Sequence, residues 1–265
     1  MACGTLQIQT FAARQSSPVP QVTVVVTGSG VEQTVVTDDS GNAPSLTLPA
    51  PACRDSLEET NETVQPYATV TLTARKEGYR PVTVEGVQIF AGQVTLAPLE
   101  LIPAESEARA REGEVTVIPP HALYAGNGGS GPAPETYCDG PWILERVVIP
   151  QKITVHLGKP AASAQNVTVS FRDYIANVAS SEVYPTWPEQ ALRANIHAQI
   201  SLALNRVYTE WYPSKGYRFN ITNSTSYDQY YVHGRTVFDV MVRITDDIFN
   251  TYARKSGTVN PYYTE

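Results

Sequence analysis

Cysteine is scarce in this sequence, and the few copies form no recognisable set. Cys3, Cys53 and Cys138 lie far apart and match neither a zinc-ligand spacing nor a dense disulfide framework. The pattern favours a reducing compartment or incidental cysteines. A Cys3–Cys53 disulfide is left open, because bridging depends on a distance between Cα atoms that the sequence does not give.

Long apolar runs and clustered basic residues are also missing. No stretch approaches the roughly 20 apolar residues that a membrane helix needs. Residues 1–4 lead directly into a predicted strand, so we expect neither a signal peptide nor a lipidation signal, and any export would use a route that the chain does not encode. The net charge of -7 argues against nucleic acid as a partner.

The chain has 265 residues, of which 42% are hydrophobic, so it is long enough for two domains with separate cores. Residues 1–103 contain short runs rich in β-branched residues, separated by turn residues such as Asp38, Asp39 and Gly41. The runs are 5–11, 22–27, 33–37, 45–48, 68–75, 82–84, 87–90 and 93–101. Short strands at this regular spacing predict an all-β sandwich.

The order of motifs in this domain resembles the transthyretin-like, carboxypeptidase-regulatory type of β-sandwich. The motifs are Val19-Pro20-Gln21-Val22-Thr23-Val24, Thr37-Asp38 with Gly41, Thr73-Ala74 with Gly78-Tyr79, and Val87-Gln88-Ile89-Phe90 with Gly92-Gln93. The resemblance implies a non-catalytic adaptor module. No His/Glu cluster suggests a metal in this domain, and Asp38 and Asp39, which could bind calcium, are of types more common as turn formers.

Residues 104–142 are predicted to be a linker and surface loop, because residues 119–141 are rich in Gly, Pro and Ser. His121 and Cys138 fall in this segment and are interpreted as incidental. Residues 143–265 then mix predicted strands and helices, which indicates an α+β domain with three amphipathic helices on a small sheet. The strands predicted in it are residues 145–150, 153–157 and 166–171.

The first predicted helix of that domain carries a carboxylate on its apolar stripe. Phe171, Ile175, Val178 and Glu182 fall at i, i+4, i+7 and i+11. Burial on this stripe and the negative end of the helix dipole both disfavour the charged form, so we expect a raised pKa for Glu182, as a general acid needs. The alternative is a frayed helix end with Glu182 in solvent.

Two further helices are predicted. Residues 186–189 match a capping box, and the helix that follows has polar residues on one face, which could line a site or simply be solvated. They are Arg193, Asn195, His197, Gln199 and Asn205. The apolar positions of that helix are Leu192, Ile196, Ile200, Ala203, Leu204, Val207 and Trp211. A third helix is indicated by the spacing of Val237, Phe238, Met241, Ile244, Ile248 and Phe249. We expect its Asp246 and Asp247 on the solvated outer face.

These helices carry a resemblance to a known family. The matching residues are Tyr174-Ile175, Val178-Ala179-Ser180-Ser181-Glu182, Pro185, Trp187-Pro188, Glu189-Gln190-Ala191-Leu192-Arg193-Ala194, Gly216-Tyr217 and Ser226-Tyr227-Asp228-Gln229-Tyr230-Tyr231. They resemble the core signature of the sporulation stage II protein D and amidase-enhancer family, over residues 151–260. The resemblance implies a peptidoglycan lytic transglycosylase in which Glu182 is the catalytic residue. The substrate-binding residues that it implies are Ser181, Tyr174, Arg193, His197, Gln229 and Tyr231.

In such an enzyme one glutamate performs both proton transfers. Glu182 would protonate the glycosidic oxygen and then take the proton of the sugar's own 6-hydroxyl, giving a 1,6-anhydro product without the second carboxylate of other glycosidases. The implied partners are peptidoglycan glycan strands, with other cell-wall hydrolases as further partners. The implied location is the cell wall or spore envelope of a Gram-positive bacterium, because the domain combination is similar to that of spore cortex-lytic proteins.

The sequence also departs from that family. Residues 198–202 lack its usual arginine, and no Ser-Gln-Trp-Gly segment precedes Glu265. Asn223, Tyr227 and Asp228 stand where some members bind a metal through cysteine and histidine. We therefore predict no zinc and no cofactor, and we expect an incomplete cleft. The alternative function is a non-catalytic peptidoglycan-binding, spore-envelope or appendage structural protein.

Overall fold

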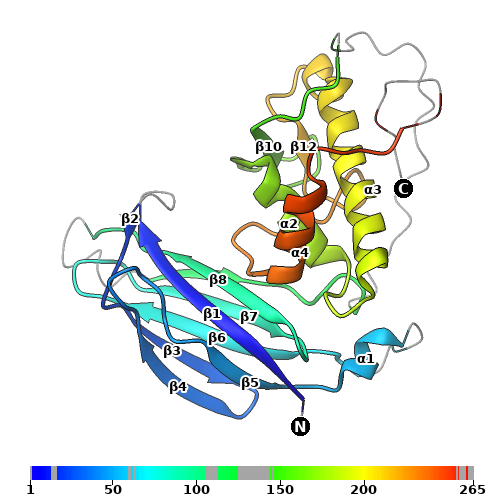
Figure 1. Ribbon diagram of the computed structural model, residues 1–265. Coiled ribbons are helices and arrows are strands. Elements are labelled where there is room, and N and C mark those ends of the chain that lie inside the picture. Colours follow the sequence, from blue (N-terminus) through cyan, green and yellow to red (C-terminus); the bar gives the residue numbers. More distant parts are fainter. Residues whose placement is uncertain are drawn as a thin grey trace. The chain divides into compact units, whose positions relative to one another are not determined.

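The computed structural model describes residues 2–12, 17–58, 61, 64–104, 113–124, 144, 146–254, 256 and 261. The chain forms two compact units (Figure 1). The first comprises Met1–Pro120 and Gly234–Val240, and the second comprises His121–His233 and Met241–Glu265. The described part is β-rich, with mixed sheets and four α-helices. The sequence pattern does not anticipate the return of residues 234–240 to the first unit.

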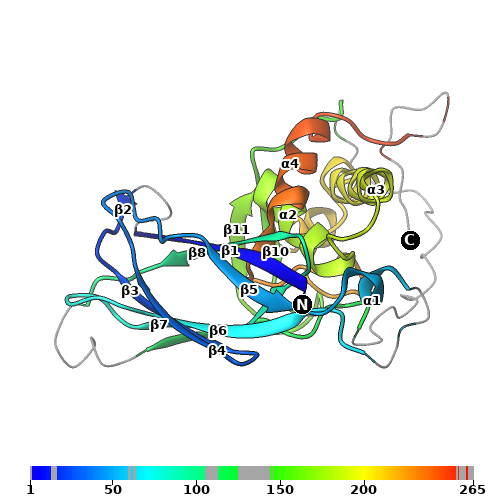
Figure 2. The same cartoon turned by 60° about the horizontal axis from the view of Figure 1, so that its bottom comes forward.

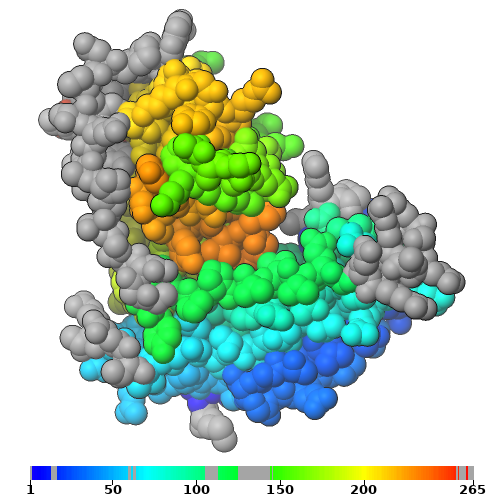
Figure 3. Space-filling model, turned by 180° about the vertical axis from the view of Figure 1, so that it is seen from behind, coloured from blue at the N-terminus to red at the C-terminus, as the bar shows by residue number. Residues whose placement is uncertain are grey.

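The first unit consists of two sheets that share one core (Figure 2). One sheet has the order β13-β8-β1-β2, with β5 paired to β1, and the other has the order β4-β3-β6-β7-β9. In Figure 3 the colours run from blue to green across one face, following the second order. Leu6 and Leu48 of one sheet share a fully buried cluster with Val24 and Leu72 of the other, so the sheets pack face to face.

The elements of the first unit have the following bounds. The strands are β1 Ala2–Ala12, β2 Ser17–Pro18, β3 Thr23–Gly28, β4 Val31–Val36, β5 Leu46–Ala50, β6 Ala68–Arg75, β7 Val82–Ile89, β8 Val94–Glu100, β9 Glu114–Val117 and β13 Val237–Phe238. A short helix, α1, spans Cys53–Leu57. Most strands lie where alternating β-branched residues predict them, and β6 has the predicted bounds.

Strand β1 is the centre of the first sheet, because it pairs with β2, β5 and β8. Leu6 and Ile8 are buried, while Gln7 and Gln9 between and beside them are exposed, as expected for a strand with one face on a core. At Gly4 the strand approaches its neighbour closely. A Cβ atom there would lie 2.3 Å from the backbone oxygen of Phe90, so the position has no room for a side chain.

The turn before β5 explains the aspartate pair of the first unit. Asp38 Oδ1 accepts hydrogen bonds from the backbone N–H groups of Ser40 and Asn42, both at 2.9 Å. Gly41 has a φ of 76°, in the left-handed region that favours glycine. Asp38 therefore has the turn-forming role, the more common of the two roles expected. Among the described residues, no group of three or more His, Cys, Asp or Glu side chains could hold a metal ion.

The second unit combines three helices with a small sheet of order β11-β10-β12. Its elements are β10 Lys152–His156, β11 Asn166–Ser170, α2 Phe171–Glu182, α3 Glu189–Tyr208, β12 Ile221–Thr222 and α4 Asp239–Ile248, the first two residues of α4 being assigned to the first unit. The predicted apolar stripes form the core, since Phe171, Ile175, Ile196, Ile200 and Ile244 are all fully buried. The start of α2 is capped by Ser170, whose side chain accepts a hydrogen bond from Asp173 N–H.

Two predicted helix starts are wrong. The capping box at residues 186–189 does not form, because Pro188 occupies the N-cap position of α3 and no side chain caps it. Helix α4 begins at Asp239 and not at Val237, because Val237 and Phe238 pair with β8 as strand β13. The acidic residues near the end of α4 are exposed but not simply solvated, since Asp246 pairs with Arg172 and Asp247 with Arg193.

Three strand predictions also change. Strand β7 joins two runs predicted separately, 82–84 and 87–90. Strand β9 lies inside the predicted linker, although its run Val115-Thr116-Val117 is β-branched, and it pairs in parallel with β7. The described residues of 145–150 form no strand, and Cys138 lies outside the described residues. Cys3 and Cys53 are free and exposed, so they form no disulfide.

The close approach at Gly4 gives a stability prediction. We expect Gly4→Ala to lower the free energy of unfolding by about 1–3 kcal/mol, because the added methyl group overlaps a backbone oxygen. Urea unfolding followed by circular dichroism measures the change. Gly113→Ala is the matched control, since its nearest contact would lie at 3.6 Å, and we expect it to be nearly neutral. An equal loss in both variants would contradict the steric explanation.

Candidate functional site

Glu182 is the last residue of α2, and its carboxylate is held by two other segments of the second unit. Oε2 accepts a hydrogen bond from Gln199 Nε2 on α3 at 2.8 Å, and Oε1 accepts one from the backbone N–H of Tyr230 at 2.8 Å. The residue is partly buried. Of the two arrangements that the sequence leaves open, the structure therefore has the carboxylate engaged within the protein and not turned to solvent.

Burial raises the pKa of Glu182 above its ordinary value. The hydrogen bonds from Tyr230 and Gln199 stabilise the carboxylate and act in the opposite direction, but they do not outweigh burial. Both donors are neutral groups, so neither places a positive charge beside the carboxylate that would lower its pKa. A carboxyl group in this environment can keep its proton at a higher pH than a solvated one.

Gln199 connects the carboxylate to the segment after β12. Its side chain is only 3% exposed, and its backbone oxygen accepts a hydrogen bond from Gln229 Nε2 at 3.1 Å. Its own Oε1 atom is buried without a hydrogen-bond partner. The side-chain amide of Gln199 therefore donates to Glu182 through Nε2, while its Oε1 accepts no hydrogen bond.

Gln229 extends the network to a pair of tyrosines. Its Oε1 accepts a hydrogen bond from Tyr174 Oη at 3.0 Å, and the rings of Tyr174 and Tyr231 stack at 5.5 Å between centroids. Burial raises the pKa of Tyr231 to about 12, with a smaller contribution from Asp173. Burial also raises the pKa of Tyr174, helped by the charges of Asp228 and Glu182. Both phenols therefore stay protonated at neutral pH and can act as hydrogen-bond donors.

The structure brings together some of the predicted site residues but not all. Ser181 is buried, and its hydroxyl donates back to Asn177 O within α2. Arg193 forms ion pairs with Glu189 and Asp247, and His197 Nδ1 lies 3.4 Å from Thr251 Oγ1. Arg193 and His197 thus contact α4 and the residues just after it. Glu182, Tyr174, Gln229 and Tyr231 instead share one connected set of contacts.

Three residues of this cluster were not among the predicted site residues. Gln199 was predicted on the polar face of α3 among residues that could line a site, and the structure buries it and directs its amide at Glu182. Asn177 is buried and exchanges two hydrogen bonds with the backbone of Val232, which fixes the end of the same segment. Tyr230 contributes only its backbone N–H, which no side-chain pattern reveals.

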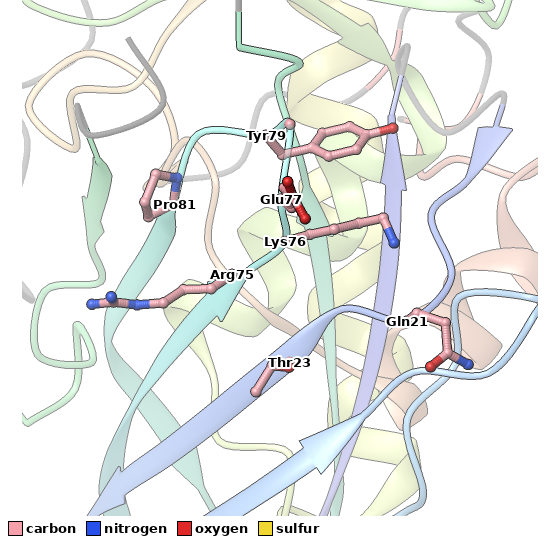
Figure 4. Close-up of a pocket in the computed structure, with 8 residues that line it drawn as sticks. Gln21, Thr23, Arg75, Lys76, Glu77, Tyr79 and Pro81 are labelled. Atoms are coloured by element: carbon pink, nitrogen blue, oxygen red, sulfur yellow. The ribbon is translucent and has the colours of Figure 1, made fainter. Parts of the chain in front are cut away.

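A hollow of about 990 Å³ lies in the first unit (Figure 4). Its lining residues are Gln21, Thr23, Arg75, Lys76, Glu77, Gly78, Tyr79 and Pro81. Arg75 extends to one side and Lys76 and Tyr79 to the other, and Lys76 Nζ is bonded to Pro20 O. Because these groups diverge, the hollow lacks the convergent polar groups typical of a ligand site.

No family model and no curated protein matches this chain. Solved structures with local similarity include the Bacillus anthracis TIE protein, 14% identical with a TM-score of 0.27 over 39% of this chain and 17% of that one. A putative carbohydrate-binding protein from Bacteroides uniformis is 13% identical, with a TM-score of 0.27 over 38% and 41%. Catechol 1,2-dioxygenase from Pseudomonas arvilla is 16% identical, with a TM-score of 0.28 over 42% and 55%. The chain thus spans between 17% and 55% of the length of these structures, and TM-scores this low bear on neither fold nor function.

Among the described residues, every helix is too short or too polar to cross a bilayer.

The Gln199 contact gives a prediction for the proton affinity of Glu182. We expect Gln199→Leu to raise the pKa of Glu182 further, because the variant removes a donor that stabilises the carboxylate and adds apolar surface. A carbon-detected NMR titration of the Glu182 carboxyl group measures the change. The control is Gln190→Leu, an exposed position on the same helix, which should leave the titration unchanged. A lower pKa in Gln199→Leu would contradict the assigned contact.

The raised pKa also predicts a pH-dependent stability difference. Glu182 binds a proton more tightly in the folded chain than in the unfolded one, so its stabilising contribution is present at low pH and is lost as the pH rises through the folded-state pKa. We expect Glu182→Gln to raise the free energy of unfolding at pH 7, with an excess over wild type that shrinks as the pH falls toward 4.5. Urea unfolding at several pH values, followed by tryptophan fluorescence, measures it.

The control for that series is Glu189→Gln. Glu189 is exposed, and its pKa is lowered by the hydrogen bond from Arg193, so the sign of its contribution is opposite. Glu189→Gln should therefore give no gain in stability at pH 7. A gain in both variants would show that the effect is general charge reduction in an acidic protein and not burial of Glu182.

Proposed function

We propose that the second unit engages peptidoglycan glycan strands and that Glu182 is the acid/base of a lytic transglycosylase reaction. The observation that carries the proposal is the environment of Glu182, a partly buried carboxyl group with a raised pKa and two neutral hydrogen-bond donors. The resemblance to the sporulation stage II protein D and amidase-enhancer family supports it, because its signature residues include Tyr174, Glu182, Gln229 and Tyr231. These residues belong to one connected cluster.

The proposed reaction needs a carboxyl group that gives and then recovers one proton. Protonated Glu182 donates to the glycosidic oxygen as the bond from that oxygen to the anomeric carbon breaks. The 6-hydroxyl oxygen of the same sugar then bonds to the anomeric carbon, and its proton returns to the carboxylate. The backbone N–H of Tyr230 donates to Oε1 whether Glu182 is charged or protonated, so Oε1 must remain an acceptor. The proton is therefore carried by Oε2.

One observation favours a second candidate, a glycan-binding protein without turnover. Both oxygens of Glu182 already accept hydrogen bonds from groups of the protein. A sugar could receive the proton of Oε2 only after Gln199 gives up its contact. If that exchange does not occur, the tyrosines and amides of the cluster would still offer stacking faces and donors to sugars, which suffices for binding.

We further propose that the first unit is a transthyretin-like adaptor module and that the protein acts in the cell wall or spore envelope of a Gram-positive bacterium, together with other cell-wall hydrolases. The face-to-face sheets of the first unit, which share one buried core, support the adaptor role. The motif order noted in the sequence adds the transthyretin-like assignment.

The test of the enzymatic proposal uses purified peptidoglycan. We expect the wild-type protein to release fragments with 1,6-anhydro ends, detected by mass spectrometry, and Glu182→Gln to lose about 100-fold or more of this rate, because general acid/base groups contribute that much. Glu189→Gln is the matched control and should retain full activity. Sedimentation with the polymer measures binding in parallel for all three proteins.

The outcomes separate the two candidates. Retention on the polymer without anhydro products from the wild-type protein would reject the enzyme and support the binding protein. Loss of activity in both glutamine variants would reject Glu182 as the specific acid. Neither retention nor products would reject the peptidoglycan assignment altogether.

A further inference from the structure

Asp228 is a second buried carboxylate of the second unit, and it belongs to the same segment as the contacts of Glu182. Its side chain is 0% exposed. It accepts hydrogen bonds from four donors, which are Arg206 Nε at 2.6 Å, Tyr212 Oη at 2.6 Å, Thr222 N at 2.9 Å and Thr222 Oγ1 at 2.7 Å. The donors come from α3, the segment after α3 and β12, so one side chain joins three parts of the unit.

The partner of Asp228 is buried as well. Arg206 is 5% exposed, and its guanidinium lies 4.9 Å from the centre of the Trp211 ring. Besides Asp228 it binds the backbone oxygen of Tyr227, the preceding residue, at 2.8 Å. Arg206 therefore binds the side chain of Asp228 and the backbone of Tyr227. A buried ion pair contributes little net stability compared with apolar packing, but it defines one geometry strictly, because either charge left alone is costly.

The residues that follow immediately make the contacts of the candidate site. Gln229 bonds Tyr174 and the backbone of Gln199, and the N–H of Tyr230 bonds Glu182. Only Gln229 lies between Asp228 and Tyr230, whose N–H faces Glu182. A shift at residue 228 must therefore move that donor, since the backbone between them has few free torsions.

We propose that Asp228, locked to Arg206, is a positioning residue that holds the N–H of Tyr230 on Glu182 and the amide of Gln229 between α2 and α3. The role at Glu182 is a matter of geometry and does not depend on turnover. Its consequence for catalysis rests on the proposed function.

The experiment measures hydrogen exchange at the Tyr230 amide by NMR in the full chain. We expect Asp228→Asn to speed exchange at Tyr230 by about tenfold or more relative to the amide of Ile196 inside α3, because a charge-assisted anchor is lost close to it. Ile244→Val is the matched control. It removes a buried methyl group from α4, away from the anchor, and should change both amides by a similar factor.

A milder variant covers the case in which Asp228→Asn does not fold. Tyr212→Phe removes one of the four donors without leaving an unpaired charge, and it should speed exchange at Tyr230 in the same direction by a smaller factor. Exchange at Tyr230 that follows Ile196 in these variants, or that does not change, would overturn the proposal. A local change at Tyr230 alone would support it.

A second readout separates this inference from the proposed function. If the wild-type protein releases anhydro sugars, Asp228→Asn should lower the maximal rate by about tenfold and leave the half-saturating polymer concentration nearly unchanged, since the residue acts through Glu182. An unchanged rate would overturn the catalytic consequence. If the wild-type protein releases none, the proposed function fails, while the exchange measurement still decides the role of Asp228.

Discussion

Three segments that are far apart in the sequence contact one another at the carboxylate of Glu182. The hydrogen bonds of this carboxylate join the end of α2 to α3 and to the segment after β12. A carboxylate withdrawn from water needs donors close by, because an unpaired buried charge is costly. Gln199 supplies one donor from the middle of α3, and Tyr230 supplies the other from the segment after β12. The end of α2, the buried stripe of α3 and residues 228–232 are therefore joined at one point.

The same unit holds two buried carboxylates with different partners, and the difference separates their roles. Asp228 faces a guanidinium, a phenol and a threonine, so its partners include an opposite charge. Glu182 faces an amide and a backbone N–H, which satisfy its oxygens without a neighbouring positive charge. Burial can then raise the pKa of Glu182. One carboxylate suits a structural anchor, and the other suits a group that exchanges protons.

Much of this fold could be predicted from residue patterns, because its elements follow from local periodicity. The alternation of Leu6 and Ile8 with polar residues predicts β1, and the stripe from Phe171 to Val178 predicts α2. The errors occur where a distant partner decides the structure. Val237 and Phe238 have helical spacing with the residues after them, but pairing with β8 makes them a strand. Strand β9 likewise pairs with the distant β7, and its β-branched run Val115-Thr116-Val117 lies in a segment predicted to be linker.

The candidate site could be predicted in part for the same reason. The position of Glu182 on an apolar stripe indicates its burial. Gln199 was predicted on the polar face of α3, and its burial follows from its tertiary contacts with Glu182 and Gln229. The donor at Tyr230 could not, because every residue except proline has a backbone N–H and only the tertiary structure decides where it points. The polar face of α3 suggested Arg193 and His197 as site residues, yet they contact α4 and Thr251, because charged groups on neighbouring helices pair with one another.

The unused acceptor of Gln199 bears on how Glu182 can exist in two protonation states. With the carboxylate charged, Nε2 donates to Oε2 and the Oε1 atom of the amide has no partner. With a proton on Oε2 that donor would face another donor, which is unfavourable, so this contact favours the charged form and opposes the effect of burial on the pKa. Leucine at position 199 would remove the contact and leave only the N–H of Tyr230 to oppose burial.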